Sequence, residues 1–392
     1  MTKDPATICL AVGETLIWAS ILYLFPALIL RWEQSLGWSK AELTLGITLG
    51  LLVFAFCAPV AGRLIDAGRG AAMMGGASLL GAAGLVWLST IESLPAFYGA
   101  WSVLGVAMAG TLYEPCFAIV TRARGENAKR SIIAITLVAG FAGTISFPAA
   151  HALSDAFGWR VAVLCFAGTA AFVAGPLLYT GARLLEVARR STEQADAPDT
   201  LAQRRFLARP AFWLLAFGFM FVAVIQGATL HHLLLIFDDR GVPPESAIIA
   251  ASFIGPMQVA GRLAMMAGGD RATNHGFAVA AFFLIAGAMV ALFYAGAALF
   301  LAIGFVVLFG AAYGTVSILR PVIAREVLGG NNFGAKAGAL AVPYLVGQAA
   351  APYLGSLLWG LGGYDLMLAV LVVCAGIGCG LYVLSRRVAH RS

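Results

Sequence analysis

Long apolar runs, separated by short polar breaks, recur through the whole of this chain. A helix needs about 20 mainly apolar residues to cross the hydrocarbon core of a bilayer. Of the 392 residues, 61% are hydrophobic and only 11% are charged. Soluble domains carry charge on about a quarter of their residues, so this chain lacks the polar surface that a water-soluble globule would need. We predict an all-α membrane protein.

The apolar runs predict twelve transmembrane helices in two groups of six, divided by one long hydrophilic stretch. The predicted spans cover residues 8–30, 42–62, 71–90, 95–120, 131–153, 160–182, 211–236, 246–267, 275–294, 297–319, 335–359 and 366–385. The gap contains RRSTEQADAPDTLAQRR, which is typical of a solvated linker. We expect an N-terminal six-helix bundle over residues 1–185, a cytoplasmic linker over 186–209 and a C-terminal six-helix bundle over 210–392. The first apolar stretch is too long for the core of a signal peptide, so we expect a retained span.

The Lys and Arg residues indicate how these spans are oriented. Cytoplasmic loops of membrane proteins carry an excess of Lys and Arg. With the N-terminus inside, the outer loops hold Arg31, Lys40, Arg160 and Arg240, and the other 21 of the 25 basic residues lie in inner loops and tails. We predict a multi-pass protein of the plasma (inner) membrane with both termini cytoplasmic. The same loops account for the net charge of +6, so no nucleic acid is expected as a partner.

The sequence lacks common nucleotide-binding, hydrolytic and haem-binding motifs. It contains no GxxxxGKS phosphate loop, no GxSxG, no HExxH and no haem-ligand spacing. Its six cysteines lie in apolar runs without metal-ligand spacing, which predicts neither a disulfide framework nor a metal site. We therefore expect no enzyme activity, no cofactor and no metal, and an ion gradient or simple facilitation rather than ATP should drive the protein.

A short internal repeat supports two related halves. PVAGRLIDAGRG begins at Pro59, and QVAGRLAMMAGGDR begins at Gln258. Their shared Gly-Arg-Leu core lies 199 residues apart, and Tyr113 and Tyr313 lie 200 apart. Two duplicated halves are typical of carriers that bind a solute between them.

The stretch Gly62-Arg-Leu-Ile-Asp66-Ala-Gly68-Arg69-Gly, between the second and third spans, resembles the loop signature of the major facilitator superfamily. The resemblance implies the major facilitator fold of twelve helices in two six-helix bundles. It also implies a conformational latch, formed here by Gly62, Asp66 and Arg69, that helps to hold the inner ends of the bundles together. Asp66 can pair with Arg69 on the same helical face or with a helix end. The second copy of the repeat has Met265 where the first has Asp66.

Within that superfamily, three segments resemble the monocarboxylate-porter branch and its bacterial relatives. They are LYLFPALILRWEQSLGWSKAEL at 22–43, TLYEPCFAIVTR at 111–122 and AIIAASFIGPMQVAGR at 247–262. The branch binds its carboxylate with a span-eight arginine, which Arg262 matches. Gln258 replaces the branch's aspartate four residues earlier, and Ala27 replaces the first-span lysine of the animal members.

Two acidic residues lie within the predicted spans, where a charge is costly and therefore a candidate for function. Glu14 lies in the first span, where it can exchange protons or can be solvated near the membrane face. Glu114 lies in the fourth span directly before Pro115, and a kink there can turn its carboxyl toward a cavity or leave it to cap freed backbone groups. We expect proton coupling by Glu114 and Glu14.

Basic and polar residues in the spans are the substrate-binding candidates. Arg262 is interpreted as an anion ligand in span eight or as a loop residue like Arg63, and Arg320 as a second anion ligand, a gate or a rim residue. His231 and His232 point about 100° apart, so one can be a relay or substrate donor while the other packs. The remaining polar candidates, on spans expected to line or border the cavity, are Tyr23, Tyr113, Gln226, Gln258 and Tyr313.

Together these features predict a monomeric secondary active transporter that moves a small, monocarboxylate-like organic anion with protons, by alternating access. The alternative is a proton-driven exporter of hydrophobic or cationic compounds. Exporters in this superfamily usually carry a glycine-rich, proline-containing signature in span five, and VAGFAGTISFPAA there lacks that pattern. A receptor or scaffold that binds a ligand without transporting it is the third hypothesis.

Overall fold

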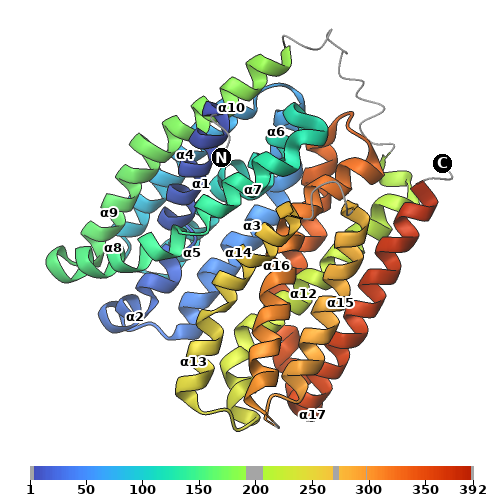
Figure 1. Ribbon diagram of the computed structural model, residues 1–392. Helices are drawn as coiled ribbons and strands as arrows, with labels where there is room; N and C mark the ends of the chain where they lie inside the picture. Colours follow the sequence, from blue (N-terminus) through green and yellow to red (C-terminus); the bar gives the residue numbers. More distant parts are fainter. Residues whose placement is uncertain (1–3, 191–205, 268–272, 297, 390–392) are drawn as a thin grey trace. The chain divides into compact units, whose positions relative to one another are not determined.

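The computed structural model describes residues 4–190, 206–267, 273–296 and 298–389, and every regular element in them is a helix (Figure 1). Helices satisfy all their backbone hydrogen bonds internally, which the interior of a bilayer requires. Contacts divide the chain into two compact units. The first comprises Met1–Gln203 with Gly330–Val342, and the second comprises Arg204–Gly329 with Pro343–Ser392.

The first unit contains ten α-helices among its described residues, apart from the start of a long helix described below. They are α1 (Pro5–Ser20), α2 (Leu24–Leu36), α3 (Lys40–Asp66), α4 (Gly70–Ser89), α5 (Leu94–Thr111), α6 (Tyr113–Arg124), α7 (Ala128–Ala139), α8 (Ala142–Phe157), α9 (Trp159–Thr169) and α10 (Gly175–Arg190). A π-helical turn at Ala170–Ala174 joins α9 to α10. The helix α10 continues five residues into the predicted linker, and residues 191–205 of that linker lie outside the described part.

The described helices of the second unit differ widely in length, from nine residues to 57. They are α12 (Pro210–Asp239), α13 (Pro244–Ser252), α14 (Ile254–Ala267), α15 (Asn274–Phe293), α16 (Leu299–Leu328) and α17 (Phe333–Ala389). The helix α17 begins in the segment that clusters with the first unit and continues in the second. Non-helical backbone at Gly362 and Gly363 divides it, and Gly363 has a φ of 68°, a left-handed conformation that favours glycine.

Ten helical stretches in the described residues are long and apolar enough to cross a membrane. One of them is α17, whose 57 residues include both of the predicted spans 335–359 and 366–385 on either side of the glycine break. The predicted span 246–267 corresponds to α13 and α14, which a break at Phe253 shortens. The ten stretches therefore correspond to the twelve predicted spans, because α17 contains two spans and the span formed by α13 and α14 is not counted among the ten. The prediction of an all-α membrane protein is confirmed.

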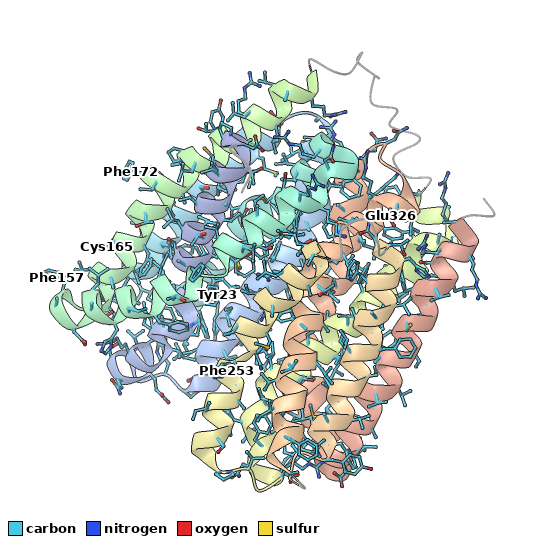
Figure 2. The ribbon with its side chains drawn as sticks, viewed as in Figure 1. Tyr23, Phe157, Cys165, Phe172, Phe253 and Glu326 are labelled. Atoms are coloured by element: carbon cyan, nitrogen blue, oxygen red, sulfur yellow. The ribbon has the colours of Figure 1, made fainter. Side chains whose placement is uncertain are left out.

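Large apolar side chains cover much of the outward surface. Phe157 and Phe172 point away from the helices that carry them, and Phe172 keeps 81% of its surface exposed (Figure 2). Exposed apolar patches of this kind are unfavourable in water and match a lipid environment. The helix ends follow ordinary rules. At the start of α3, Ser39 Oγ accepts a hydrogen bond from the backbone of Glu42, and the Glu42 carboxylate accepts one from the Ser39 backbone.

Candidate functional site

Glu14 lies on α1 in the first unit and is completely buried. Its Oε2 accepts a hydrogen bond from the indole Nε1 of Trp18, one turn further along the helix, at 3.1 Å. The thiol of Cys116, on α6, lies beside the same carboxyl. Its other oxygen, Oε1, has no nitrogen or oxygen donor among the described residues. A carboxyl buried in a membrane helix can bind and release a proton.

An aromatic cluster adjoins this carboxyl through Trp18. The Trp18 ring lies 4.5 Å from Tyr113 and 6.2 Å from Tyr23, between ring centroids. Phe117 stacks on Tyr113 at 4.7 Å, and Phe147 meets Tyr23 edge-on at 6.3 Å. The structure therefore brings three predicted residues, Glu14, Tyr23 and Tyr113, into one neighbourhood. Sequence reasoning missed Trp18, although its spacing of four residues from Glu14 places both on one helical face.

Glu114 occupies the first turn of α6, just after the fourth predicted span is interrupted. The helix α5 ends at Thr111, Leu112 has extended backbone, and α6 begins at Tyr113. The positive end of the α6 dipole therefore faces a half-buried carboxylate. This position differs from that of Glu14, which lies within α1 and is completely buried.

In the second unit, Tyr344 of α17 contacts two predicted residues from different helices. The guanidinium carbon of Arg320, on α16, lies 3.9 Å from the centroid of the Tyr344 ring. The Tyr344 hydroxyl donates a hydrogen bond of 3.2 Å to Oε1 of Gln226, on α12. Arg320 is 8% exposed and Gln226 is 2% exposed. The Gln226 Nε2 has no hydrogen-bond partner among the described residues.

Arg262 is buried within α14, where it is 5% exposed. Its Nη2 donates to Oε1 of Gln258, one turn earlier, at 3.5 Å. The α14 helix packs on α16 so closely that a Cβ added at Gly314 would lie 2.2 Å from the Gln258 carbonyl oxygen. Tyr313, next to that glycine, is half-buried and lies 6.3 Å from Phe309. Arg63, the repeat mate of Arg262, is exposed.

The two adjacent histidines of α12 have different environments. His231 is exposed, and its Nδ1 hydrogen-bonds the Gly227 carbonyl of its own helix at 2.7 Å. His232 is buried against α17, with Nε2 3.1 Å from the Pro352 carbonyl oxygen and Nδ1 3.5 Å from the Tyr364 hydroxyl. His232 is therefore a packing residue, and His231 is the one whose ring remains accessible.

Two residues of the predicted latch, Asp66 and Gly62, contact the start of α17. Both carboxylate oxygens of Asp66 accept backbone hydrogen bonds, from Gly334 at 2.9 Å and from Ala335 at 2.6 Å. A Cβ at Gly62 would lie 2.0 Å from the Gly334 carbonyl oxygen, so only glycine allows this approach. Asp66 thus bonds to a helix end, which was one of its two predicted partners, whereas Arg69 is exposed.

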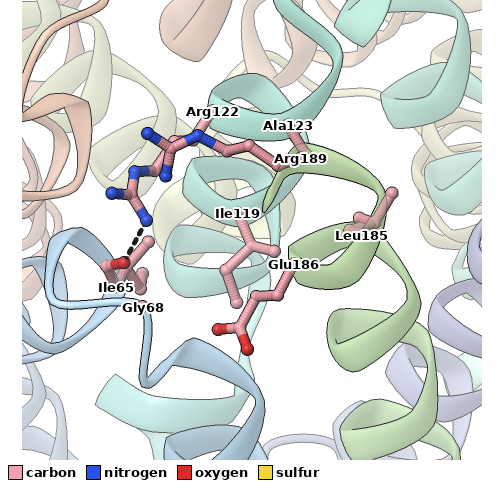
Figure 3. Close-up of a pocket in the computed structure, with 8 residues that line it drawn as sticks. All are labelled: Ile65, Gly68, Ile119, Arg122, Ala123, Leu185, Glu186 and Arg189. Carbon is pink, nitrogen blue, oxygen red and sulfur yellow. Dashed lines mark hydrogen bonds between the residues drawn. The ribbon is translucent and has the colours of Figure 1, made fainter. Parts of the chain in front are cut away.

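Arg122 supports the same region and was missed from the sequence. It donates to the carbonyl oxygens of Ile65 at 2.5 Å and Asp66 at 2.7 Å, and its Nε lies 3.5 Å from the Asp66 carboxylate. Beside it is an open hollow with about 340 Å³ of space, lined also by Arg189 and Glu186 (Figure 3). The Glu186 carboxylate accepts from the Ala71 backbone at the start of α4. We interpret this hollow as part of the packing of the helix ends.

No group of three or more His, Cys, Asp or Glu that could hold a metal ion occurs in the part of the chain that the structure describes. Candidate binding and proton-exchange residues lie in both units. The first unit holds an acid beside aromatic rings, and the second holds buried arginines with amide and phenol groups.

Comparison with known proteins gives a family match over most of the chain. The model of the Major Facilitator Superfamily matches residues 6–352. Among curated proteins, none matches the sequence significantly. Similar solved structures include the superfamily transporter FucP in its outward conformation, with a TM-score of 0.72 and 15% identity over 97% of this chain and 98% of that one.

Two further similar structures also share 15% identity. The human organic anion transporter MFSD10 (TETRAN) has a TM-score of 0.66 and is covered completely, with 99% of this chain. The N162A variant of the E. coli fucose:proton symporter FucP has a TM-score of 0.70, over 97% of this chain and 98% of that one. At this identity the likeness establishes the fold alone, and it confirms the predicted major facilitator fold.

Proposed function

The chain belongs to the major facilitator superfamily, and we propose that it carries a small, monocarboxylate-like organic anion together with protons by alternating access. Membership makes it a multi-pass secondary transporter with a small-molecule substrate, and not an enzyme. The anion, the proton coupling, the plasma (inner) membrane location, the cytoplasmic termini and a monomeric state are parts of the proposal.

One observation carries the choice of an anion. Arg262 and Arg63 occupy the same position of the internal repeat, yet Arg262 is 5% exposed and Arg63 is exposed. An arginine buried in a membrane helix costs several kcal/mol unless polar groups compensate. A substrate carboxylate would add to that compensation, because the planar guanidinium matches a carboxylate with two parallel hydrogen bonds. Buried Arg320 gives the second unit another such donor.

Proton coupling is assigned to Glu14 and Glu114. A proton that enters with the anion neutralises the net charge of the loaded carrier, which lowers the cost of moving buried charge. Glu14 supports this role through its complete burial and through Oε1, which has no nitrogen or oxygen donor in the described part of the chain. Glu114, which is half-buried at a helix N-terminus, is the second proton-exchanging group.

The anion assignment is tested by uptake into proteoliposomes. Acetate, propionate and benzoate, each radiolabelled, are offered with an inward proton gradient, beside neutral and cationic solutes of similar size. Uptake by protein-free liposomes is subtracted throughout, because the protonated acids cross lipid unaided. We expect a carboxylate to accumulate, and Arg262→Ala to reduce its uptake at sub-saturating concentration at least about tenfold, because truncating one partner of a buried charge pair costs about 2–5 kcal/mol. Arg63→Ala is the matched control and should transport normally. Equal uptake by the two variants would refute the role of Arg262.

A second candidate function has its own supporting observation. Glu14 adjoins the aromatic rings of Trp18, Tyr23 and Tyr113, and an acid beside aromatic faces suits a lipophilic cation. This arrangement favours the exporter alternative. Proton-driven uptake of tetraphenylphosphonium into inverted vesicles, whose cytoplasmic face points outward, without transport of any carboxylate, would establish it instead.

A further inference from the structure

Three side chains from three helices of the second unit form a continuous polar group. Tyr344 of α17 touches Arg320 of α16 with its ring and Gln226 of α12 with its hydroxyl. The helices on either side are mostly apolar, and both Arg320 and Gln226 are more than nine-tenths buried. Buried polar groups in a membrane protein are expensive unless each is satisfied, so this group needs an explanation.

Within this group, the side-chain amide of Gln226 gives the clearest indication of a ligand. One of its polar atoms, Oε1, is bonded to Tyr344, while Nε2 has no partner in the described part of the chain. Turning the amide over would exchange the two atoms and would still leave one of them unbonded. An amide donor buried without a partner costs about 1–3 kcal/mol. A ligand that accepts a hydrogen bond at this position would recover that free energy.

Tyr344 fixes both neighbours. A guanidinium stacked over an aromatic face has a defined plane, because cation–π attraction and stacking favour parallel contact. The hydroxyl, at the other end of the same ring, sets the rotation of the Gln226 amide. The two donor groups are thus held by one rigid side chain, which reduces the conformational entropy lost when a ligand binds.

We propose that Tyr344 is the positioning residue of an anion-binding site in the second unit. It holds Arg320 and Gln226 so that both donate hydrogen bonds to one carboxylate. This inference rests on the proposed function and adds to it a residue that the sequence did not indicate. It also distinguishes the two buried arginines. Arg320 belongs to the group in which the Gln226 Nε2 lacks a partner among the described residues, whereas Arg262 donates a hydrogen bond to Gln258 of its own helix.

The test measures carboxylate binding to purified full-length protein by thermal shift. Acetate, propionate and benzoate are titrated against acetamide, propionamide and benzamide, their uncharged analogues. We expect the strongest-binding carboxylate to lose about five- to tenfold in affinity in Tyr344→Phe, which keeps the ring and removes only the hydroxyl. Gln226→Leu should lose a similar factor. Arg320→Lys should lose more than tenfold, since lysine keeps the charge but not the planar guanidinium.

A double variant separates positioning from independent binding. If the Tyr344 hydroxyl acts through the Gln226 amide, the two losses should not multiply. The double variant Tyr344→Phe, Gln226→Leu should then bind the carboxylate as tightly as the single variant of lower affinity. Multiplied losses, or an unchanged affinity in Tyr344→Phe, would overturn the inference. Tyr353→Phe, an exposed tyrosine on the same helix, is the matched control, and the ligand-free melting temperature identifies any variant that is merely misfolded.

Failure of the proposed function has a different signature. The anion assignment fails if the wild-type protein is stabilised by none of the carboxylates, or is stabilised equally by their amides. The proposed anion-binding site around Tyr344 then fails with it. If a carboxylate binds the wild type and Tyr344→Phe alike, only the role of Tyr344 is lost.

Discussion

Three ionisable side chains, Glu14, Arg262 and Arg320, have at most 8% of their surface exposed in helices that are mostly apolar. Each lowers the stability of the unliganded protein, because removing a charge from water costs several kcal/mol even after relaxation. Such residues persist where a substrate or an ion uses them. Their burial is therefore the residue-level basis of the proposed transport.

An ion pair outside the spans has a predictable pH dependence. Asp4 accepts hydrogen bonds of 2.6 Å from the Thr7 hydroxyl and from Arg124. Burial alone would raise the pKa of Asp4, but the Thr7 hydrogen bonds and the Arg124 charge outweigh it, so the pKa lies below its usual value. A lowered pKa in the folded state stabilises the fold above the unfolded-state pKa of about 3.9, and this stabilisation is lost as the pH falls through the folded value.

We therefore expect Asp4→Asn to lower stability by about 0.5–1 kcal/mol at pH 7, the range of a partly exposed ion pair, and to have a smaller effect near pH 3.5. The measurement is the melting temperature in detergent at several pH values. Asp238→Asn, on an exposed residue of α12, provides the comparison. A difference between wild type and Asp4→Asn that grows as the pH falls would contradict the lowered pKa of Asp4.

Burial of individual residues could be predicted from the sequence only in part. The apolar context correctly placed Glu14 within a helix. It left Arg262 open between a span and a loop and ended the predicted span one residue before Arg320, whereas both arginines lie in helices. The shared Gly-Arg-Leu core could not reveal that Arg63 is exposed and Arg262 is buried, because that difference depends on how α14 packs against α16. Tyr344 and Trp18 were missed because an aromatic residue in an apolar span has the same sequence signature whether it packs or binds.

At the level of helices, two membrane-spanning segments are interrupted by short breaks. Leu112 separates α5 from α6 directly before Tyr113 and Glu114, and Phe253 separates α13 from α14. Hydropathy predicts where an apolar run lies, but it is insensitive to a one-residue change of backbone conformation within that run. Pro115 signalled the first break. No proline or glycine stands at Phe253, although Gly255 and Pro256 follow it closely.

The contact between α3 and the start of α17 gives a sharp test of packing. A Cβ at Gly62 would lie 2.0 Å from the carbonyl oxygen of Gly334, a backbone atom that cannot move aside without shifting its helix. We expect Gly62→Ala to lower stability by about 1–3 kcal/mol, the usual cost of overpacking. Thermal unfolding in detergent measures this. Gly76→Ala on α4, where nothing lies within 4 Å of the added Cβ, should be neutral or slightly stabilising, and equal losses in both variants would refute the close contact.

At the scale of the whole molecule, the all-α membrane fold and the family were predictable, since each depends on a pattern repeated over many residues. The family match and the similar structures confirm both. The division into units was less predictable. The short segment Gly330–Val342 clusters with the N-terminal residues, because Asp66 and Gly62 bind the start of α17 through contacts more than 250 residues apart in the sequence.

The central claim is that a buried acid in one unit couples protons to an anion held by arginines in the other. It is tested most directly by comparing two activities of one variant in proteoliposomes: pH-driven accumulation of the carboxylate, and exchange of labelled for unlabelled carboxylate without a gradient. Glu14→Gln keeps the shape of the side chain and removes its titration. Glu92→Gln, on an exposed loop residue, is the control, and Glu114→Gln is measured alongside.

We predict that Glu14→Gln abolishes accumulation against a gradient and retains exchange, because a permanently neutral residue still allows the loaded carrier to reorient but cannot release a proton. Glu92→Gln should behave as wild type in both assays. Full pH-driven accumulation by both Glu14→Gln and Glu114→Gln would contradict the proposed coupling.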